Sequence, residues 1–206
     1  MNIEFHFDFG SPNAYLSHLV IPAIEARTGE SFKYVPVLIG GVFKATGNAS
    51  PAVTLHGIKN KGEYQGIETE RFLKKHDITC FNRNPFFPVN TLQIMRGAIF
   101  AQHHYYFEQY VDQVYRHMWS EPKKMDDPDV IKSALELSGL PVDEIIASMQ
   151  DPEIKQALIT NTQRSVEMGS FGSPTFYVEN EIFFGKDKLA DVEEEIITRK
   201  HLTKQS

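Results

Sequence analysis

The chain has 206 residues, of which 41% are hydrophobic and 23% charged, and these values are typical of a globular protein with a sizeable core. Its 21 Lys and Arg residues stand against 27 Asp and Glu residues, so the net charge is -6, and no basic stripe stands out. We therefore expect no nucleic-acid partner.

Neither a membrane span nor a signal peptide is expected. The sequence has no run of about 18 apolar residues, and Glu4 and Asp8 interrupt the apolar residues near the N-terminus. Cys80 is the single cysteine, which excludes an internal disulfide and a dithiol redox couple. We expect a reducing compartment, the cytoplasm.

The chain opens with a strand pattern that runs directly into a helix start. Apolar and polar residues alternate from Ile3 to Phe9, which is the period of a β-strand. Gly10 permits a turn, Ser11 can cap a helix, and Pro12 sits where a helix has no N–H to lose. This places a hydroxyl among unpaired N–H groups at the positive end of a helix dipole, where an anion is favoured. Taken alone, such a stretch is also typical of ordinary capping.

A strand–helix–strand unit follows from this start. A helix is predicted from Asn13 to Arg27, with Gly29 as its stop and with Pro22 as the place of a kink or a split. Phe32–Val37 predicts a second strand, and a connection of this length implies a parallel, right-handed crossover. The glycines and polar residues between positions 40 and 62 predict a loop-rich passage with at most short helices, and such passages are usually functional.

The middle of the chain is helical in pattern from about Ile67 to Met168. Helix starts are indicated at Asn90, Asp127-Pro128, Pro141 and Asp151-Pro152, and stops at Gly139 and Gly169. We place a discontinuous domain at residues 1–39 and 165–206, and an inserted loop-rich and helical subdomain at residues 40–164.

The last part of the chain returns to strands. Thr175–Val178 and Glu181–Phe184 predict an antiparallel hairpin. A last helix is predicted from Lys188 to about Lys200, with Asp187 as its cap. Ser173-Pro174 ahead of the hairpin is a candidate for a cis peptide bond or marks the start of the strand.

The order strand, helix, strand, helical insertion, proline, hairpin and helix predicts an α/β, thioredoxin-like fold with a large all-helical insertion. The sequence resembles the kappa-class glutathione transferases and the 2-hydroxychromene-2-carboxylate isomerases, within the broader DsbA-like group, over nearly the whole chain. The segments that carry the resemblance are Phe7–Leu16, Gly47–Asn48, Lys61–Tyr64, Phe87–Leu92, Met118–Glu121, Phe171–Thr175 and Phe184–Leu189. Redox members hold Cys-x-x-Cys where this chain has Ser11 to Ala14, so disulfide exchange is excluded.

The resemblance implies glutathione as the cofactor. Ser11 would donate a hydrogen bond to its thiolate, and the helix dipole would also favour that charge and lower a thiol pKa from about 8.5. Asn48 would lie near the sulfur, although a Gly-Asn turn explains this residue equally well.

The resemblance also implies contacts for the rest of the tripeptide. Together with Gly172–Thr175 ahead of a strand, it predicts that the Ser173–Pro174 bond is cis and lies across from Ser11. The backbone of Ser173 would pair there with the cysteinyl amide, and Ser173 departs from the aliphatic residue that most members carry. Asp187 would meet the γ-glutamyl ammonium, with Lys186 beside it as a second departure. Lys61 would meet the glycyl carboxylate, with Lys59 as a competitor for this contact and solvated surface as the alternative for both.

A second substrate would need an apolar wall near the Ser11 turn. Phe43, Phe86, Phe87, Pro88 and Trp119 are the residues we expect there, although aromatic residues at this spacing are also typical of a core. His103, His104 and His117 have no companion ligands at metal-binding spacing, so we expect no metal.

The resulting hypothesis is a glutathione-dependent isomerase of the 2-hydroxychromene-2-carboxylate type, acting in aromatic degradation. The resemblance implies that a bound thiolate adds to the open-chain enone, that the former double bond rotates, and that elimination returns the isomer and free glutathione. The alternatives are a kappa-like transferase or peroxidase on other electrophiles and a non-catalytic glutathione-binding module. The resemblance also implies a homodimer and a small aromatic or electrophilic substrate.

Overall fold

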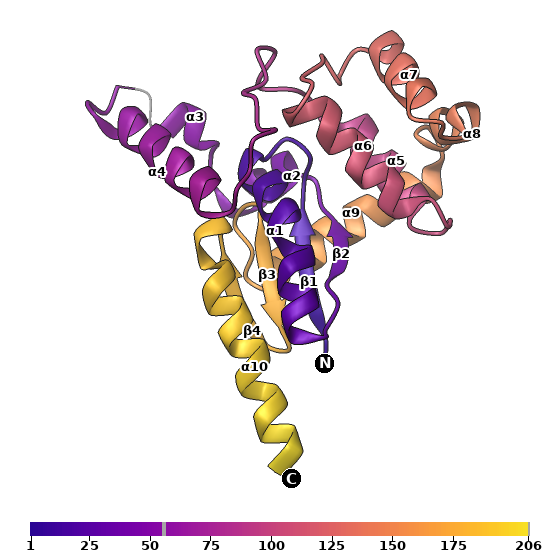
Figure 1. The fold of residues 1–206 in the computed structure, drawn as a ribbon. Helices are drawn as coiled ribbons and strands as arrows, with labels where there is room; N and C mark the ends of the chain where they lie inside the picture. Colours follow the sequence, from indigo (N-terminus) through magenta and orange to yellow (C-terminus); the bar gives the residue numbers. More distant parts are fainter. Residues whose placement is uncertain (55–56, 206) are drawn as a thin grey trace.

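The computed structural model describes residues 1–54 and 57–205, and its centre is a four-stranded sheet in the order β2-β1-β3-β4 (Figure 1). β1 (Ile3–Phe7) pairs in parallel with β2 (Lys33–Pro36) and antiparallel with β3 (Thr175–Val178). β3 pairs antiparallel with β4 (Glu181–Phe184). The predicted parallel crossover and the predicted hairpin are both confirmed.

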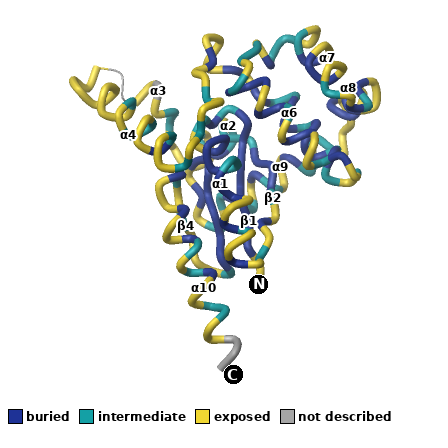
Figure 2. Tube along the Cα trace, in the orientation of Figure 1, coloured by how far each residue is buried: buried dark blue, intermediate teal, exposed yellow. Residues whose placement is uncertain are grey.

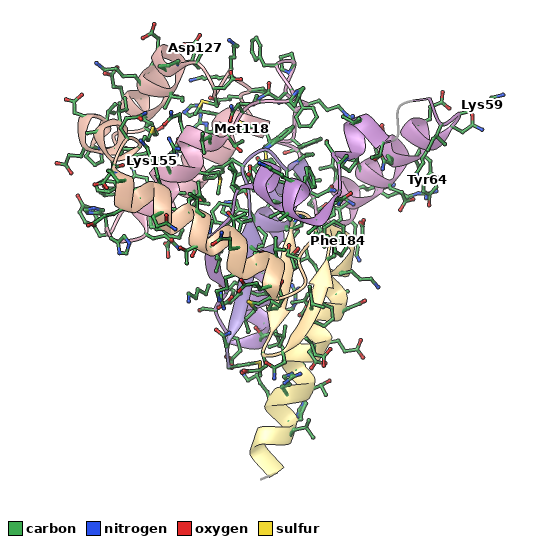
Figure 3. The ribbon with its side chains drawn as sticks, turned by 180° about the vertical axis from the view of Figure 1, so that it is seen from behind. Lys59, Tyr64, Met118, Asp127, Lys155 and Phe184 are labelled. Atoms are coloured by element: carbon green, nitrogen blue, oxygen red, sulfur yellow. The ribbon has the colours of Figure 1, made fainter. Side chains whose placement is uncertain are left out.

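Helices cover both faces of this sheet. α1 (Pro12–Thr28) and α10 (Leu189–Gln205) lie on one face, and α9 (Pro152–Glu167) crosses the other, as the front and back views show (Figures 1 and 3). The short 3-10 helix η1 (Lys186–Lys188) leads into α10. Every residue of β1 is therefore buried, including the polar members of its alternating pattern, because their side chains face α9 and not solvent.

α1 runs without a break through Pro22, whose side chain is exposed, so the predicted split of this helix was wrong. Its end is as predicted: Gly29 adopts the left-handed conformation with φ 69°, and its N–H bonds to the carbonyl of Glu25 at 2.7 Å.

The loop-rich passage after β2 contains two short helices, α2 (Ile39–Thr46) and α3 (Pro51–Thr54), as expected. α4 (Lys61–Lys75) follows, and it begins at Lys61, earlier than the predicted start near Ile67. Gly62 and Gly66 weaken the helical pattern of its first turns, which explains the late prediction. α4 stands away from the body of the protein as an arm, and most of its residues are exposed (Figures 1 and 2).

The other helices form a lobe at one end of the sheet. They are α5 (Leu92–Ala101), α6 (Phe107–Trp119), α7 (Pro128–Leu137) and α8 (Val142–Ser148). The predicted helix starts at Asp127 and Asp151 are confirmed, since Asp127 accepts the N–H of Asp129 at 3.1 Å and Asp151 accepts that of Glu153 at 2.7 Å. The core is continuous between the lobe and the sheet. Because α9 packs against both α5 and β2, the proposed domain boundary near residue 164 stays a prediction.

Across residues 1–54 and 57–205, no helix has the length and apolar character needed to cross a membrane.

Candidate active site

Ser11 is the N-cap residue of α1, as predicted. Its Oγ accepts the N–H of Ala14 at 3.2 Å, and Pro12 occupies the first helical position. The hydroxyl donates to the carbonyl oxygen of Ser173 at 2.8 Å, and the residue is only 5% exposed. The first turn of α1 is thereby joined to the loop that enters β3.

That loop contains the predicted cis bond between Ser173 and Pro174, directly across from Ser11. The Oγ of Ser173 accepts the N–H of Asp8 at 3.1 Å. The pairing of β1 with β3 ends at His6 and Thr175, so the buried N–H of Asp8 needs another acceptor. The hydroxyl of Ser173 supplies one, and this gives the departure at position 173 a local structural role.

Asp8 is a residue that sequence reasoning missed. It is fully buried, its Oδ1 accepts the N–H of Gly10 at 2.7 Å, and its Oδ2 accepts the N–H of Ile39 at 2.7 Å. Burial raises the pKa of Asp8, whereas these two N–H groups and the side chain of Thr91 act in the opposite direction. A signal was present in the sequence, because Asp8 is an acidic residue between two core phenylalanines, directly ahead of the predicted turn.

Asn48 lies beside the same loop. Gly47 ends α2 in the left-handed conformation, and the side-chain amide of Asn48 then donates to the carbonyl oxygen of Phe171 at 2.8 Å. Its Oδ1 accepts the N–H of Ala49 at 2.8 Å. The structure therefore brings Asn48 close to the Ser173–Pro174 loop, with its amide engaged in holding that loop.

Lys186 and Asp187 form an adjacent ion pair, in which the side chain of Lys186 is buried and that of Asp187 is 73% exposed. The ammonium of Lys186 also lies over the ring of Phe72, 4.6 Å from its centroid, a cation–π contact. The prediction that Asp187 caps the last helix was wrong, because Asp187 lies within η1 and its carboxylate pairs with Lys186.

A cavity of about 290 Å³ opens between α1, the base of α4 and the start of α10. Lys186 and Asp187 line it, together with the apolar residues Val20 and Ile24. Val20 lies about 13 Å along the axis of α1 from Ser11, at a rise of about 1.5 Å per residue. A fully extended tripeptide spans roughly 10–11 Å, which is shorter than the distance from Ser11 to Val20.

Lys61 and Lys59 do not join the residues around Ser11. Lys61 is the first residue of α4, and Figure 3 shows Lys59 at the outermost end of the arm. The chain forms a helix here that points outward from Lys75 to Lys61, and the contact of Lys61 or Lys59 with a glycyl carboxylate stays a prediction.

The predicted aromatic wall is divided between the core and the surface. Trp119 is buried, and its Nε1–H donates to the carbonyl oxygen of Phe9 at 2.7 Å. Phe87 lies with its ring centroid 5.9 Å from that of Trp119, and the bond from Phe87 to Pro88 is cis. Phe86 and Phe87 are exposed, so this side of the Ser11 turn presents an apolar surface.

Phe43 is placed on the other side, next to Gly172. A Cβ atom at Gly172 would lie 3.8 Å from the Phe43 ring and 2.9 Å from that of Phe184. Phe184 in turn lies 4.3 Å from Phe171, centroid to centroid. Phe171 and Phe184 are exposed, and with the half-buried Phe43 they form a second aromatic surface beside the cis bond. Sequence reasoning did not assign Phe171 or Phe184 to the site.

The polar residues of β1 form a separate network on the opposite face of the sheet. Both carboxylate oxygens of the buried Glu4 accept from Arg164, at 2.8 and 3.0 Å, and His6 bonds to Glu4 at 2.8 Å. The hydrogen bond from His6 and those from Arg164 hold the pKa of Glu4 well below its ordinary range, and burial lowers the pKa of His6. Within the part of the chain that the structure describes, no group of three or more His, Cys, Asp or Glu residues could hold a metal ion.

Comparisons with known proteins agree with this architecture. The family model of the DsbA-like thioredoxin domain matches residues 2–197. The chain is 25% identical over 189 residues to a 2-hydroxychromene-2-carboxylate isomerase of Sphingobium xenophagum, covering 91% of this chain and 93% of that one. It is 24% identical over 206 residues to glutathione S-transferase kappa 1 of Caenorhabditis elegans, covering 91% and 87% of the two chains.

A solved structure of 2-hydroxychromene-2-carboxylate isomerase matches 100% of both chains with a TM-score of 0.84 at 21% identity, which shows a common fold. The predicted thioredoxin-like fold and the resemblance to these enzymes are confirmed. Because the family model matches nearly the whole sequence, the chain belongs to the family of DsbA-like thioredoxin domains.

Proposed function

We propose that this protein is a glutathione-dependent isomerase of the 2-hydroxychromene-2-carboxylate type. The observation that carries the proposal is the hydroxyl of Ser11, held at the start of α1 and 2.8 Å from the carbonyl oxygen of Ser173. Redox members of the family hold a thiol at this position, and this chain has none between Ser11 and Ala14. The thiol must therefore come from a ligand.

The residues around Ser11 fit glutathione. The carbonyl of Ser173 already accepts one hydrogen bond and can accept one from the amide of a peptide. The positive end of the α1 dipole favours an anion beside the Ser11 hydroxyl. Lys186 and Asp187 offer one charge of each sign, which suits the carboxylate and the ammonium of a γ-glutamyl group.

The hydrogen bond from Ser11 to Ser173 suggests how the hydroxyl is made available. Ser11 has one hydroxyl proton, and in this structure it goes to the carbonyl of Ser173. An N–H of the ligand that donates to the same carbonyl keeps this acceptor paired when the Ser11 hydroxyl rotates away from it to donate to a thiolate. Glutathione would supply that thiolate as a nucleophile that adds reversibly and leaves unchanged.

The exposed aromatic surfaces on both sides of the turn suit an aromatic substrate. Phe87 covers Trp119 on one side, and Phe43 lies with Phe184 on the other. A kappa-type transferase acting on other electrophiles is the alternative, because the similarity to glutathione S-transferase kappa 1 is almost as high and the Ser11–Ser173 contact would serve both reactions.

The test follows the absorbance of a chromene carboxylate and the concentration of free thiol in the same reaction. An isomerase changes the spectrum of the substrate while the free thiol stays constant. A transferase consumes one thiol for each substrate converted. A chromene substrate that isomerises equally fast without added thiol would contradict the proposal.

We also propose that the protein acts in the cytoplasm as a homodimer. Tyr64 and Ile67, one turn apart on α4, expose large apolar side chains that a second subunit could cover. Sedimentation at micromolar concentration should give a species of twice the monomer mass, and a monomer would contradict the dimer.

A further inference from the structure

Asp8 is hydrogen-bonded to three separate segments of the proposed site. Its carbonyl oxygen accepts the N–H of Ser11 at 3.0 Å, and its N–H donates to Ser173 Oγ at 3.1 Å. Its two carboxylate oxygens accept the N–H groups of Gly10 and Ile39, each at 2.7 Å. One buried residue thus touches the Ser11 turn, the loop with the cis bond and the start of α2.

The contact with α2 completes a ring of interactions. Leu38, the N-cap residue of α2, has no side chain that could cap the helix, so Asp8 supplies an acceptor from a distant part of the chain. A carboxylate at this end also suits the dipole of α2. At its other end α2 leads to Asn48, which holds the carbonyl of Phe171, two residues before Ser173. The ring returns to Asp8 through the hydroxyl of Ser173.

The packing at Gly10 indicates that this arrangement is tight. A Cβ atom at Gly10 would lie 3.2 Å from Asp8 Oδ1 and 3.1 Å from Thr91 Cγ2, closer than ordinary contacts. Thr91 also bonds to the Asp8 carboxylate. The turn therefore closes directly onto the carboxylate, and a side chain at position 10 would require Thr91 or the Asp8 carboxylate to shift by a few tenths of an ångström.

We propose that Asp8 is a positioning residue, which ties the Ser11 turn, the Ser173–Pro174 loop and the α2–Asn48 segment into one unit and so fixes the Ser11 hydroxyl for a bound thiol. The role requires a carboxylate, because each oxygen accepts one backbone N–H. An amide has one acceptor oxygen, and its NH₂ group would face a backbone N–H. The catalytic part of this inference rests on the proposed function, whereas the structural part does not.

The test is Asp8→Asn, with Asp127→Asn as the matched control. Asp127 undergoes the same chemical change at a helix start in the lobe, away from Ser11 (Figure 3). Amide hydrogen exchange measured by NMR should accelerate about 10-fold or more at Gly10, Ser11 and Ile39 in Asp8→Asn, because the amide can hold only one of the two N–H groups. The control should leave these three rates unchanged.

The second readout concerns the ligand. In Asp8→Asn the pKa of bound glutathione should rise by about one unit and turnover at neutral pH should fall about 10- to 100-fold, because the Ser11 hydroxyl is no longer held in place. Thr91→Val, which removes one hydrogen bond to the carboxylate and keeps the side-chain shape, should shift the exchange rates and the pKa in the same direction by less. This milder variant serves if Asp8→Asn does not fold.

The outcomes separate this inference from the proposed function. If the amide exchange rates of Gly10 and Ile39 are unchanged in Asp8→Asn and in Thr91→Val, the inference is overturned. This holds whether or not the pKa of bound glutathione changes. Faster exchange with an unchanged pKa of bound glutathione also overturns the inference. The loss of the Asp8 contacts would then leave the hydrogen bond from Ser11 to the thiolate unchanged. If the wild-type protein binds no glutathione, the proposed function fails, and the exchange rates still decide whether Asp8 holds the three segments together.

Discussion

Replacing Ser11 with alanine removes two hydrogen bonds that the structure defines. One is the cap from Ala14 N–H to Ser11 Oγ at 3.2 Å, and the other runs from the Ser11 hydroxyl to the Ser173 carbonyl at 2.8 Å. Loss of an N-cap costs about 0.5–2 kcal/mol, and loss of a neutral hydrogen bond costs about 0.5–1.5 kcal/mol. We therefore expect Ser11→Ala to lower the free energy of unfolding by about 1–3 kcal/mol, measured by urea unfolding.

The larger consequence concerns the ligand. A hydrogen bond to a charged group contributes about 1.5–3 kcal/mol, and one pKa unit corresponds to about 1.36 kcal/mol. Without the Ser11 hydroxyl, the pKa of bound glutathione should rise by about one to two units, and turnover near neutral pH should fall with it. Titration of thiolate absorbance in the wild type and in Ser11→Ala measures this shift.

An S-alkyl glutathione provides the control for this titration. It has no thiolate to stabilise, so its affinity should change little in Ser11→Ala. If bound glutathione has the same pKa in both proteins, Ser11 is only a helix cap and the proposed role of its hydroxyl is refuted.

Three further substitutions test the fold. Gly97→Ala should lower the free energy of unfolding by about 1–3 kcal/mol in urea, because the added Cβ would lie 2.8 Å from Cζ of the buried Tyr110. Equal stability of the two proteins would show that the Tyr110 ring can move. Trp119→Phe should cost about 1–3 kcal/mol in the same assay, because it leaves a buried carbonyl without its donor. Arg164→Met should destabilise through the buried Glu4, whose pKa is lowered in the folded protein. This contribution is present above the ordinary Glu pKa of 4.5 and is lost as the pH falls below it, so the stability gap to wild type should narrow in acid; a constant gap would argue against the ion pair.

Local signals in the sequence predicted a large part of the fold. Asp127 and Asp151 each precede a proline, and each carboxylate accepts the N–H of the residue two positions later. Such caps can be predicted from a few neighbouring residues of the sequence. The turn at Ser11 was predictable for the same reason. The strands followed from alternation, and the pairing of β1 with β2 followed from the length of the connection.

Tertiary contacts were not predictable in this way. Asp8 bonds to Ile39 and to Thr91, which lie far along the chain, and nothing in the residues around Asp8 indicates these partners. Lys61 was expected near the ligand, but its position depends on the direction in which α4 leaves the body of the protein. Position 173 holds a serine where most relatives carry an aliphatic residue. Only the structure shows that the Ser173 hydroxyl accepts the N–H of Asp8.

The most direct test of the proposed function is the rate of chromene carboxylate isomerisation measured against glutathione concentration, with S-methylglutathione as a competitor. The contact between Ser11 and Ser173 predicts a rate that is zero without thiol, saturates as glutathione is added, and is competitively inhibited by the S-methyl compound. Isomerisation that continues at the same rate without glutathione would contradict a mechanism based on a bound thiolate. A rate that S-methylglutathione does not lower would contradict it as well.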